Sequence, residues 1–94
     1  MELSDTTEVV ASRYLVGAEV GDEIILLHLE NGHYFGLDDV SARIWKLLQK
    51  PTTVRDIEHA LLEEYEIESG RCHEEVMRLL SDLIEQGLVE RTDV

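Results

Sequence analysis

The sequence is poor in the residues that mark secreted, disulfide-bonded and membrane-spanning proteins. Its one cysteine, Cys72, cannot form an internal disulfide, and a lone thiol suits a reducing compartment. No run approaches the roughly 18 consecutive apolar residues of a membrane span. Residues 1–20 contain charged side chains and no apolar block, so they do not resemble a signal peptide. We therefore expect a cytoplasmic protein that does not associate with membranes.

Basic residues are also scarce. Lys and Arg total 8 against 21 Asp and Glu, which gives a net charge of −13. A field of this sign repels the phosphate backbone of nucleic acids and attracts cationic partners. A highly charged surface also protects a small domain from aggregation, and that role alone would account for the excess. The charge thus argues against nucleic-acid binding, but it does not identify a partner.

The length of 94 residues and the apolar content of 44% suit one domain with one small core. The polar residues 1–8 are expected to form a flexible lead-in, and residues 9–94 a single domain. The sequence contains no internal repeat, low-complexity segment or linker.

Three strands are predicted in the first half of the chain. Residues 9–17 and 24–30 are rich in β-branched and apolar side chains, and 33–37 follow as a short aromatic strand. Asn31 and Gly32 predict a two-residue type I′ turn between the second and third strands. That turn would place Leu29 opposite Tyr34 and Leu26 opposite Leu37.

This register assigns the hairpin side chains to two faces, and both faces are largely apolar. A half-exposed sheet normally alternates cleanly between apolar and polar residues, so we expect something beyond one core to cover part of the hairpin. One face carries Ile25, Leu27, Leu29, Tyr34 and Gly36, and the other carries Leu26, His28, Phe35 and Leu37.

Three helices are predicted after the strands. Asp38 or Asp39 caps the first helix and Thr53 caps the second, because short oxygen-bearing side chains accept the free amides of a first turn. The third helix spans about 71–86, with Gly87 just beyond its end. The chain is therefore predicted to be α+β and winged helix-turn-helix-like, with a three-stranded antiparallel sheet followed by three helices.

The sequence has no convincing catalytic constellation. The segment HEEVM begins like the H-E-x-x-H zinc motif, but Met77 stands where the second histidine is required. Cys72 and His73 are adjacent on a helix and point about 100° apart, which suits neither one metal nor a nucleophile–base pair. No glycine pattern resembles a phosphate-binding loop. We expect no enzyme, no cofactor and no metal.

A winged-helix regulator is one alternative. DNA binding by that fold requires a basic recognition helix, whereas the third helix is acidic. It carries Arg71 and Arg78 against Glu74, Glu75, Asp82 and Glu85. A regulator that acts through protein contacts stays open, and DNA binding is disfavoured.

A peptide-binding module is the other reading. A three-stranded sheet has two edges, and the free side of residues 33–37 could accept an extended peptide by strand addition. The apolar arc of the third helix, about 160° wide, could form a groove wall. On the pattern alone, residues 9–16 could instead pair with this edge, and Met77 and Ile84 could simply belong to the core.

Three stretches together resemble the PqqD-like family over about residues 9–90. They are LLHLENGHYFGLDDVSARIWKLL, PTTVRDIEHALLEEYEI and EEVMRLLSDLIEQGLVE. The family pattern is an apolar strand, a turn ending in Gly, an aromatic strand ending in Leu, and an acidic helix cap. A T-V helix and a final helix closed by GLV follow. No single stretch is diagnostic, but the ordered set is fairly specific.

The resemblance implies a recognition element for ribosomally made, post-translationally modified (RiPP) precursor peptides. Family members bind the leader of a precursor as an added strand and present the core peptide to a modifying enzyme. Carried onto this sequence, the resemblance implies a docking strand and groove residues on the third helix. These are His33, Tyr34, Phe35, Gly36 and Leu37, with Val76, Met77, Leu80 and Ile84, and with Cys72 and His73 at the groove mouth.

The G-x-Y-F-G-L pattern without an attached enzyme is most similar to the discrete leader-binding protein of lasso-peptide pathways. The partners that this implies are the precursor leader, a leader peptidase of transglutaminase-like type and a macrolactam synthetase. The L-x-P-E stretch associated with pyrroloquinoline quinone proteins is replaced by LLHLENG. The alternative within the family is a peptide chaperone for a radical SAM enzyme in quinone-cofactor or other peptide-modification pathways.

Overall fold

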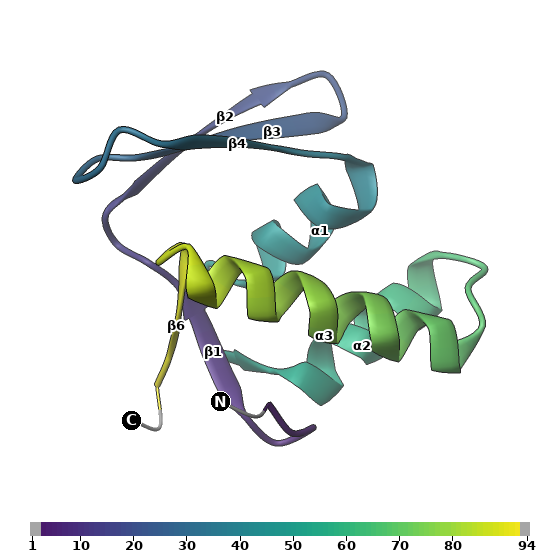
Figure 1. The fold of residues 1–94 in the computed structure, drawn as a ribbon. Coiled ribbons are helices and arrows are strands. Elements are labelled where there is room, and N and C mark those ends of the chain that lie inside the picture. Colours follow the sequence, from purple (N-terminus) through teal and green to yellow (C-terminus); the bar gives the residue numbers. More distant parts are fainter. Residues whose placement is uncertain (1–2, 93–94) are drawn as a thin grey trace.

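The computed structural model describes residues 3–92, which form six strands and three helices (Figure 1). Among these residues, no helix is long and apolar enough to cross a bilayer. In chain order the elements are β1 (Glu8–Ala11), β2 (Leu15–Val20), β3 (Glu23–His28), β4 (Tyr34–Leu37), α1 (Asp39–Leu47), β5 (Thr52–Thr53), α2 (Val54–Glu64), α3 (Ser69–Glu85) and β6 (Val89–Arg91).

The strands form two antiparallel three-stranded sheets, with orders β2-β3-β4 and β5-β1-β6. The α+β class is confirmed, with the sheet β2-β3-β4 followed by three helices. The second sheet was not predicted, and it makes the likeness to a winged helix loose.

The single strand predicted over residues 9–17 is wrong, because the chain leaves one sheet at Ala11 and enters the other at Leu15. Ser12 marks the break: its amide donates to the Leu88 carbonyl at 2.9 Å and its hydroxyl accepts from the Tyr14 amide at 3.2 Å. The sequence could not show this, since β1 pairs with strands from distant parts of the chain.

The β3–β4 connection differs from the predicted two-residue turn. The His28 amide donates to the His33 carbonyl at 2.8 Å, which leaves residues 29–32 as a four-residue loop. A type I′ turn requires positive φ at Asn31, and within residues 3–92 only glycines have positive φ. The Asn31 side chain instead accepts the His33 amide at 2.9 Å. Leu27 therefore lies opposite Tyr34, two residues from the predicted register.

The predicted faces of the hairpin survive this correction, because a shift of two residues returns each side chain to the same side of a strand. Alternate residues of β3 are buried, beginning at Ile24, and the others are exposed. Figure 1 shows α1 and α3 on one side of this sheet, and the core lies there. The largest fully buried side chains are Leu26, Leu48, Ile57, Leu61, Leu80 and Leu88.

The helix ends follow the sequence signals. The Asp38 carboxylate accepts the Ser41 amide at 2.9 Å, and the Thr53 hydroxyl accepts the Asp56 amide at 3.1 Å. Gly87, with φ +77°, follows the end of α3. These three predicted boundaries are confirmed, since each depends on local chemistry alone.

The segment before β1 lies against the start of α2. The Asp5 carbonyl accepts the Arg55 amide at 3.0 Å, the Thr7 carbonyl accepts the Val54 amide at 3.2 Å, and the Thr7 side chain is buried. The predicted lead-in and domain ranges also include residues 1–2 and 93–94, which lie outside the described residues.

We predict that Leu80→Ala lowers the free energy of unfolding by about 2–5 kcal/mol, because it leaves a cavity beneath α3. Leu62→Ala is the matched control, since Leu62 on α2 is 37% exposed, and it should cost about 1 kcal/mol or less. Urea unfolding measures both values. Equal losses in the two variants would contradict the placement of Leu80 in the core.

Candidate functional site

Among the strands of residues 3–92, β4 pairs with β3 alone and has no neighbour on its other side. Hydrogen bonding alternates along an antiparallel pair, and the His28 amide donates to the His33 carbonyl. The backbone groups of odd-numbered residues in 33–37 therefore face β3, and those of Tyr34 and Gly36 face away. Within residues 3–92, no backbone hydrogen bond from another segment reaches Tyr34 or Gly36. This edge offers two free amides and two free carbonyls.

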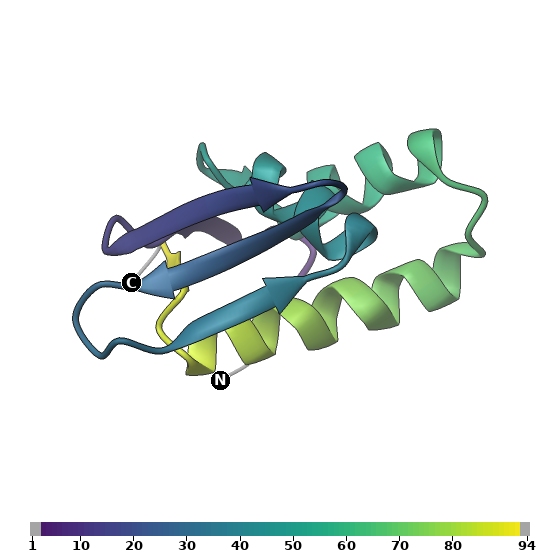
Figure 2. The ribbon, with the colours of Figure 1, turned by 90° about the horizontal axis from the view of Figure 1, so that it is seen from above.

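The alternative in which residues 9–16 cover this edge is excluded by the strand order. Residues 15–20 form β2 and pair with β3 on its opposite side, while β1 lies in the other sheet. Figure 2 shows β4 as the outer strand of its sheet, with α3 running beside it. The edge of β4 is thus open along the flank that faces α3.

A cleft of about 270 Å³ lies between α3 and the chain that leaves β4 to begin α1. Three apolar side chains contribute to its wall, and four charged ones surround them. The cleft is lined by Asp38, Val40, Ser41 and Ile44 with Glu75, Arg78, Leu79 and Asp82.

The lining of the cleft combines buried or partly buried apolar side chains with charged ones, most of them acidic. Ile44 is buried, and Val40 and Leu79 are partly buried. One arginine stands among three carboxylates, in a chain of net charge −13. An extended peptide with an apolar side chain flanked by a basic one matches this surface.

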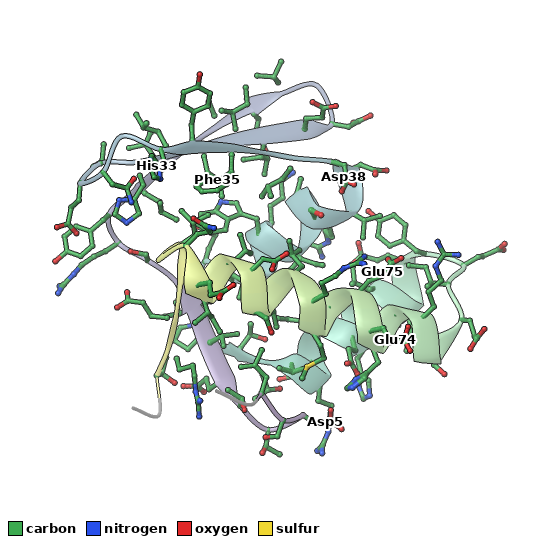
Figure 3. All side chains as sticks on the ribbon, viewed as in Figure 1. Asp5, His33, Phe35, Asp38, Glu74 and Glu75 are labelled. Carbon is green, nitrogen blue, oxygen red and sulfur yellow. The ribbon has the colours of Figure 1, made fainter. Side chains whose placement is uncertain are left out.

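The docking-strand residues named from the sequence lie together on and beside β4. Leu37 is buried and Phe35 is partly buried, and both belong to the face of the sheet that meets the core. Figure 3 shows Phe35 below the β4 ribbon, on the side of α1 and α3. Tyr34 is 74% exposed on the opposite face, and His33 precedes the strand.

The groove residues named on α3 lie elsewhere than the cleft. Cys72, Val76 and Leu80 are buried in the core, so a bound peptide would meet them only through other side chains. They hold α3 against the rest of the domain and do not line its surface.

The other three α3 residues, His73, Met77 and Ile84, project from the flank away from the cleft. At 100° per residue, they lie on the opposite side of the buried stripe from Leu79. The His73 Nδ1 atom lies 2.5 Å from the Glu58 carboxylate on α2, and Ile84 shares a hollow with Leu3. Leu79 and its neighbours on α3 line the cleft that begins beside Asp38, and these three residues do not. Their part in binding stays a prediction.

Sequence reasoning missed this flank for a physical reason. The apolar arc of α3 is wide enough to include residues on both sides of the buried stripe. Which side meets β4 depends on how α3 crosses the sheet, and no local pattern encodes that angle. Leu79 belongs to the arc, but nothing in the sequence distinguishes it from Met77.

A possible metal-ligand cluster lies on the far flank of α3. Asp5, Glu58 and His73 each bring one potential ligand atom to within 4.8 Å of the others. Asp5 and His73 are exposed, and the His73–Glu58 hydrogen bond already accounts for the closeness of two of the three groups. We assign no metal to this cluster.

The Cys72 thiol is poorly suited to nucleophilic chemistry. Burial raises its pKa above the ordinary value of 9.0, and the nearby Glu58 and Glu75 carboxylates act in the same direction. Because the thiolate is the reactive form, folding suppresses the reactivity of Cys72 through both protonation and access.

The chain has relatives of known structure. Residues 23–89 match the model of the family described as coenzyme PQQ synthesis protein D (PqqD). The chain is similar to TbiB1 in complex with the TbiA(beta) leader peptide, with a TM-score of 0.81, 36% identity and coverage of 86% of this chain and 94% of that chain. Its fold is also similar to lasso peptide synthetase B1 complexed with the leader peptide, at a TM-score of 0.77, 24% identity and coverage of 87% and 96%. No curated protein matches the sequence significantly.

We predict that Cys72 reacts with a thiol reagent such as DTNB at pH 8 at least about 100-fold more slowly in the native protein than in urea. Unfolding exposes the sulfur and returns its pKa toward the ordinary value. Absorbance at the wavelength of the released thiolate measures the rate. Rapid labelling of the native protein would show that Cys72 is accessible.

Proposed function

Because the chain belongs to the PqqD family, we propose that it binds the leader region of a ribosomally synthesised precursor peptide, of the lasso class, by strand addition to β4. The observation that carries this proposal is the free edge of β4, where no other described strand pairs with the backbone groups of Tyr34 and Gly36. A cleft that begins at Asp38, directly after β4, lies next along the chain. The complex of TbiB1 with a leader peptide supports it, since that protein is 36% identical to this chain.

The alternation of side chains along a strand determines which residues of such a peptide contact the protein. A peptide paired with β4 directs every second side chain toward the cleft, where Val40, Ile44 and Leu79 offer apolar contacts. The surrounding Asp38, Glu75 and Asp82 carboxylates favour basic peptide residues, and Arg78 accepts an acidic one.

In this proposal the chain is a carrier without catalytic activity of its own. It delivers the bound precursor to a leader peptidase of transglutaminase-like type and then to a macrolactam synthetase, and it requires no cofactor. The inert environment of Cys72 is consistent with that division of labour.

A second candidate follows from the family's description as a coenzyme PQQ synthesis protein. A peptide chaperone for a radical SAM enzyme would use the same edge of β4 and differ in which leader fits the cleft. Titration with both kinds of leader separates the two, because the preferred peptide identifies the pathway.

We predict that Gly36→Pro weakens leader binding by about tenfold or more, because it removes an amide that faces the free edge. Gly36→Ala is the matched control. Among the described residues, no heavy atom beyond Gly36 and its chain neighbours lies within 4 Å of a Cβ added at Gly36, and alanine keeps the amide, so the affinity should stay within about twofold of wild type. Fluorescence anisotropy with a labelled leader measures both. Equal affinities for the two variants would exclude strand addition at this position.

We also predict that Leu79→Glu weakens binding by about tenfold or more, since it replaces one of the three apolar side chains that line the cleft with a charged one. Met77→Glu makes the same change at another partly buried position of α3, on the opposite flank, and should change the affinity by less than about threefold. Circular dichroism confirms that each variant is folded. If Met77→Glu weakened leader binding more than Leu79→Glu, the peptide groove would lie on the flank of α3 that carries Met77.

A further inference from the structure

The sheet β2-β3-β4 has a second edge, at β2, the outer strand on the side opposite β4 (Figure 2). The Leu29 amide donates to the Tyr14 carbonyl at 2.9 Å, and hydrogen bonding alternates from there along the pair of β2 and β3. The backbone groups of Leu15, Gly17 and Glu19 therefore face away from β3. Within residues 3–92, no other strand pairs with them, so their amides and carbonyls are free.

A cleft of about 220 Å³ lies along this edge, between β2 and α1. Gly17 lies opposite the buried Leu26, so it belongs to the face of the sheet that meets the core. Gly17 has no side chain to fill the space below it, and a Cβ added there would lie 3.6 Å from the Trp45 indole nitrogen. The cleft thus leads from the free backbone of β2 to the Trp45 ring.

Two hydrogen-bond donors in this cleft have no acceptor in the described part of the chain. They belong to Trp45 and Ser12, which are both 7% exposed and both line the cleft. The Ser12 hydroxyl accepts from the Tyr14 amide, but no described group accepts its own proton, and none accepts the Trp45 indole N–H. An occupant of the cleft that brought no oxygen would leave both donors buried and unpaired.

The end of the edge that meets the β2–β3 turn is acidic. A second hollow of about 310 Å³ lies there, and Lys46 lines both it and the cleft. The arginine and the lysine of this hollow are already held in ion pairs. Its lining also contains three carboxylates that have no ion-pair partner within residues 3–92, those of Asp22, Glu23 and Asp39. A basic residue beside the end of β2 would complement them.

These features together define one kind of occupant. A second copy would bring two chains of net charge −13 together, and a carboxylate in the cleft would be repelled by the same field. We propose that the edge of β2 and its cleft, which we call the indole edge, bind an extended segment of a second protein as an added strand. The residue opposite Gly17 carries a neutral oxygen acceptor, as Asn and Gln do, and a basic residue lies at the acidic end.

The indole edge goes beyond the proposed leader site and does not depend on it. The cleft beside β4 is lined mainly by apolar and charged side chains, so the two edges select different peptides. An added strand on each edge would turn β2-β3-β4 into a five-stranded sheet. The chain would then join two other polypeptides without any contact between them.

The test uses the fact that Trp45 is the only tryptophan of the chain, so its indole N–H gives one assignable NMR resonance. The probe is a blocked peptide, Lys-Thr-Val-Gln-Val-Thr-Lys, and its match has Leu in place of Gln. The Gln probe should shift the Trp45 indole and Gly17 amide resonances and bind about fivefold more tightly than the Leu probe, the size of one neutral hydrogen bond. Trp45→Phe keeps a packed ring without the N–H, so the two probes should then bind equally, as followed at the Gly17 amide.

A pair of proline variants separates the two edges. Gly17→Pro removes a free amide of β2, and proline is tolerated on an edge strand where the N–H faces away from the sheet. It should weaken binding of the Gln probe by about tenfold or more. Gly36→Pro makes the same change on β4 and should leave the affinity for this probe within about twofold of wild type. Circular dichroism checks that both variants are folded.

Equal affinities of the wild-type chain for the Gln and Leu probes would overturn the proposal, as would a saturating probe that shifts Gly36 but not Trp45. An indole resonance that moves on dilution of the free chain would assign the edge to a second copy instead. An indole shift caused by the leader peptide would assign it to the precursor. If the Gln probe binds at Trp45 and no leader binds at β4, only the proposed function fails.

Discussion

The candidate site depends on the burial of one narrow stripe of α3. Cys72, Val76, Leu80 and Leu83 pack into the core, and this contact fixes how α3 lies beside the sheet. With the helix held there, the flank that carries Leu79 borders the cleft. The helix needs no contact with the backbone of β4 to stay in place, so the edge is left open. Removal of core volume at this stripe would therefore change the site without any change to a residue that lines it.

The faces of the sheet could be predicted from the sequence even though its register could not. Side chains in a strand alternate with period two, and the slip between the predicted and observed pairing was two residues. Phe35 and Leu37 were thus correctly placed on one face and Tyr34 on the other, although the sequence did not show which face meets the core. The loop length was missed because Asn31 takes an ordinary backbone conformation and uses its side chain to bond the His33 amide. The expectation that something covers the second apolar face stays a prediction, since Val16, Leu27 and Tyr34 are exposed on it.

The parts that sequence reasoning could not predict all depend on contacts between distant segments. The division of residues 9–17 into two strands follows from pairing with β5 and β6, which lie more than forty positions away. The cleft-facing flank of α3 follows from the angle at which the helix crosses the sheet. Helix caps such as Asp38 and Thr53, by contrast, satisfy amides within one turn and were predictable. Local chemistry thus determined where elements begin, and packing determined which surfaces they share.

The short length of β4 limits the affinity for a peptide strand added to its edge. The strand has four residues, and Asp38 begins the helix cap immediately after it. An added chain can therefore form only a few backbone hydrogen bonds, each of which contributes about 1 kcal/mol net. So small a total favours rapid release of the peptide, which suits the carrier role proposed above. It also makes the edge a poor template for fibrils, because an arbitrary strand without matching side chains would not remain bound.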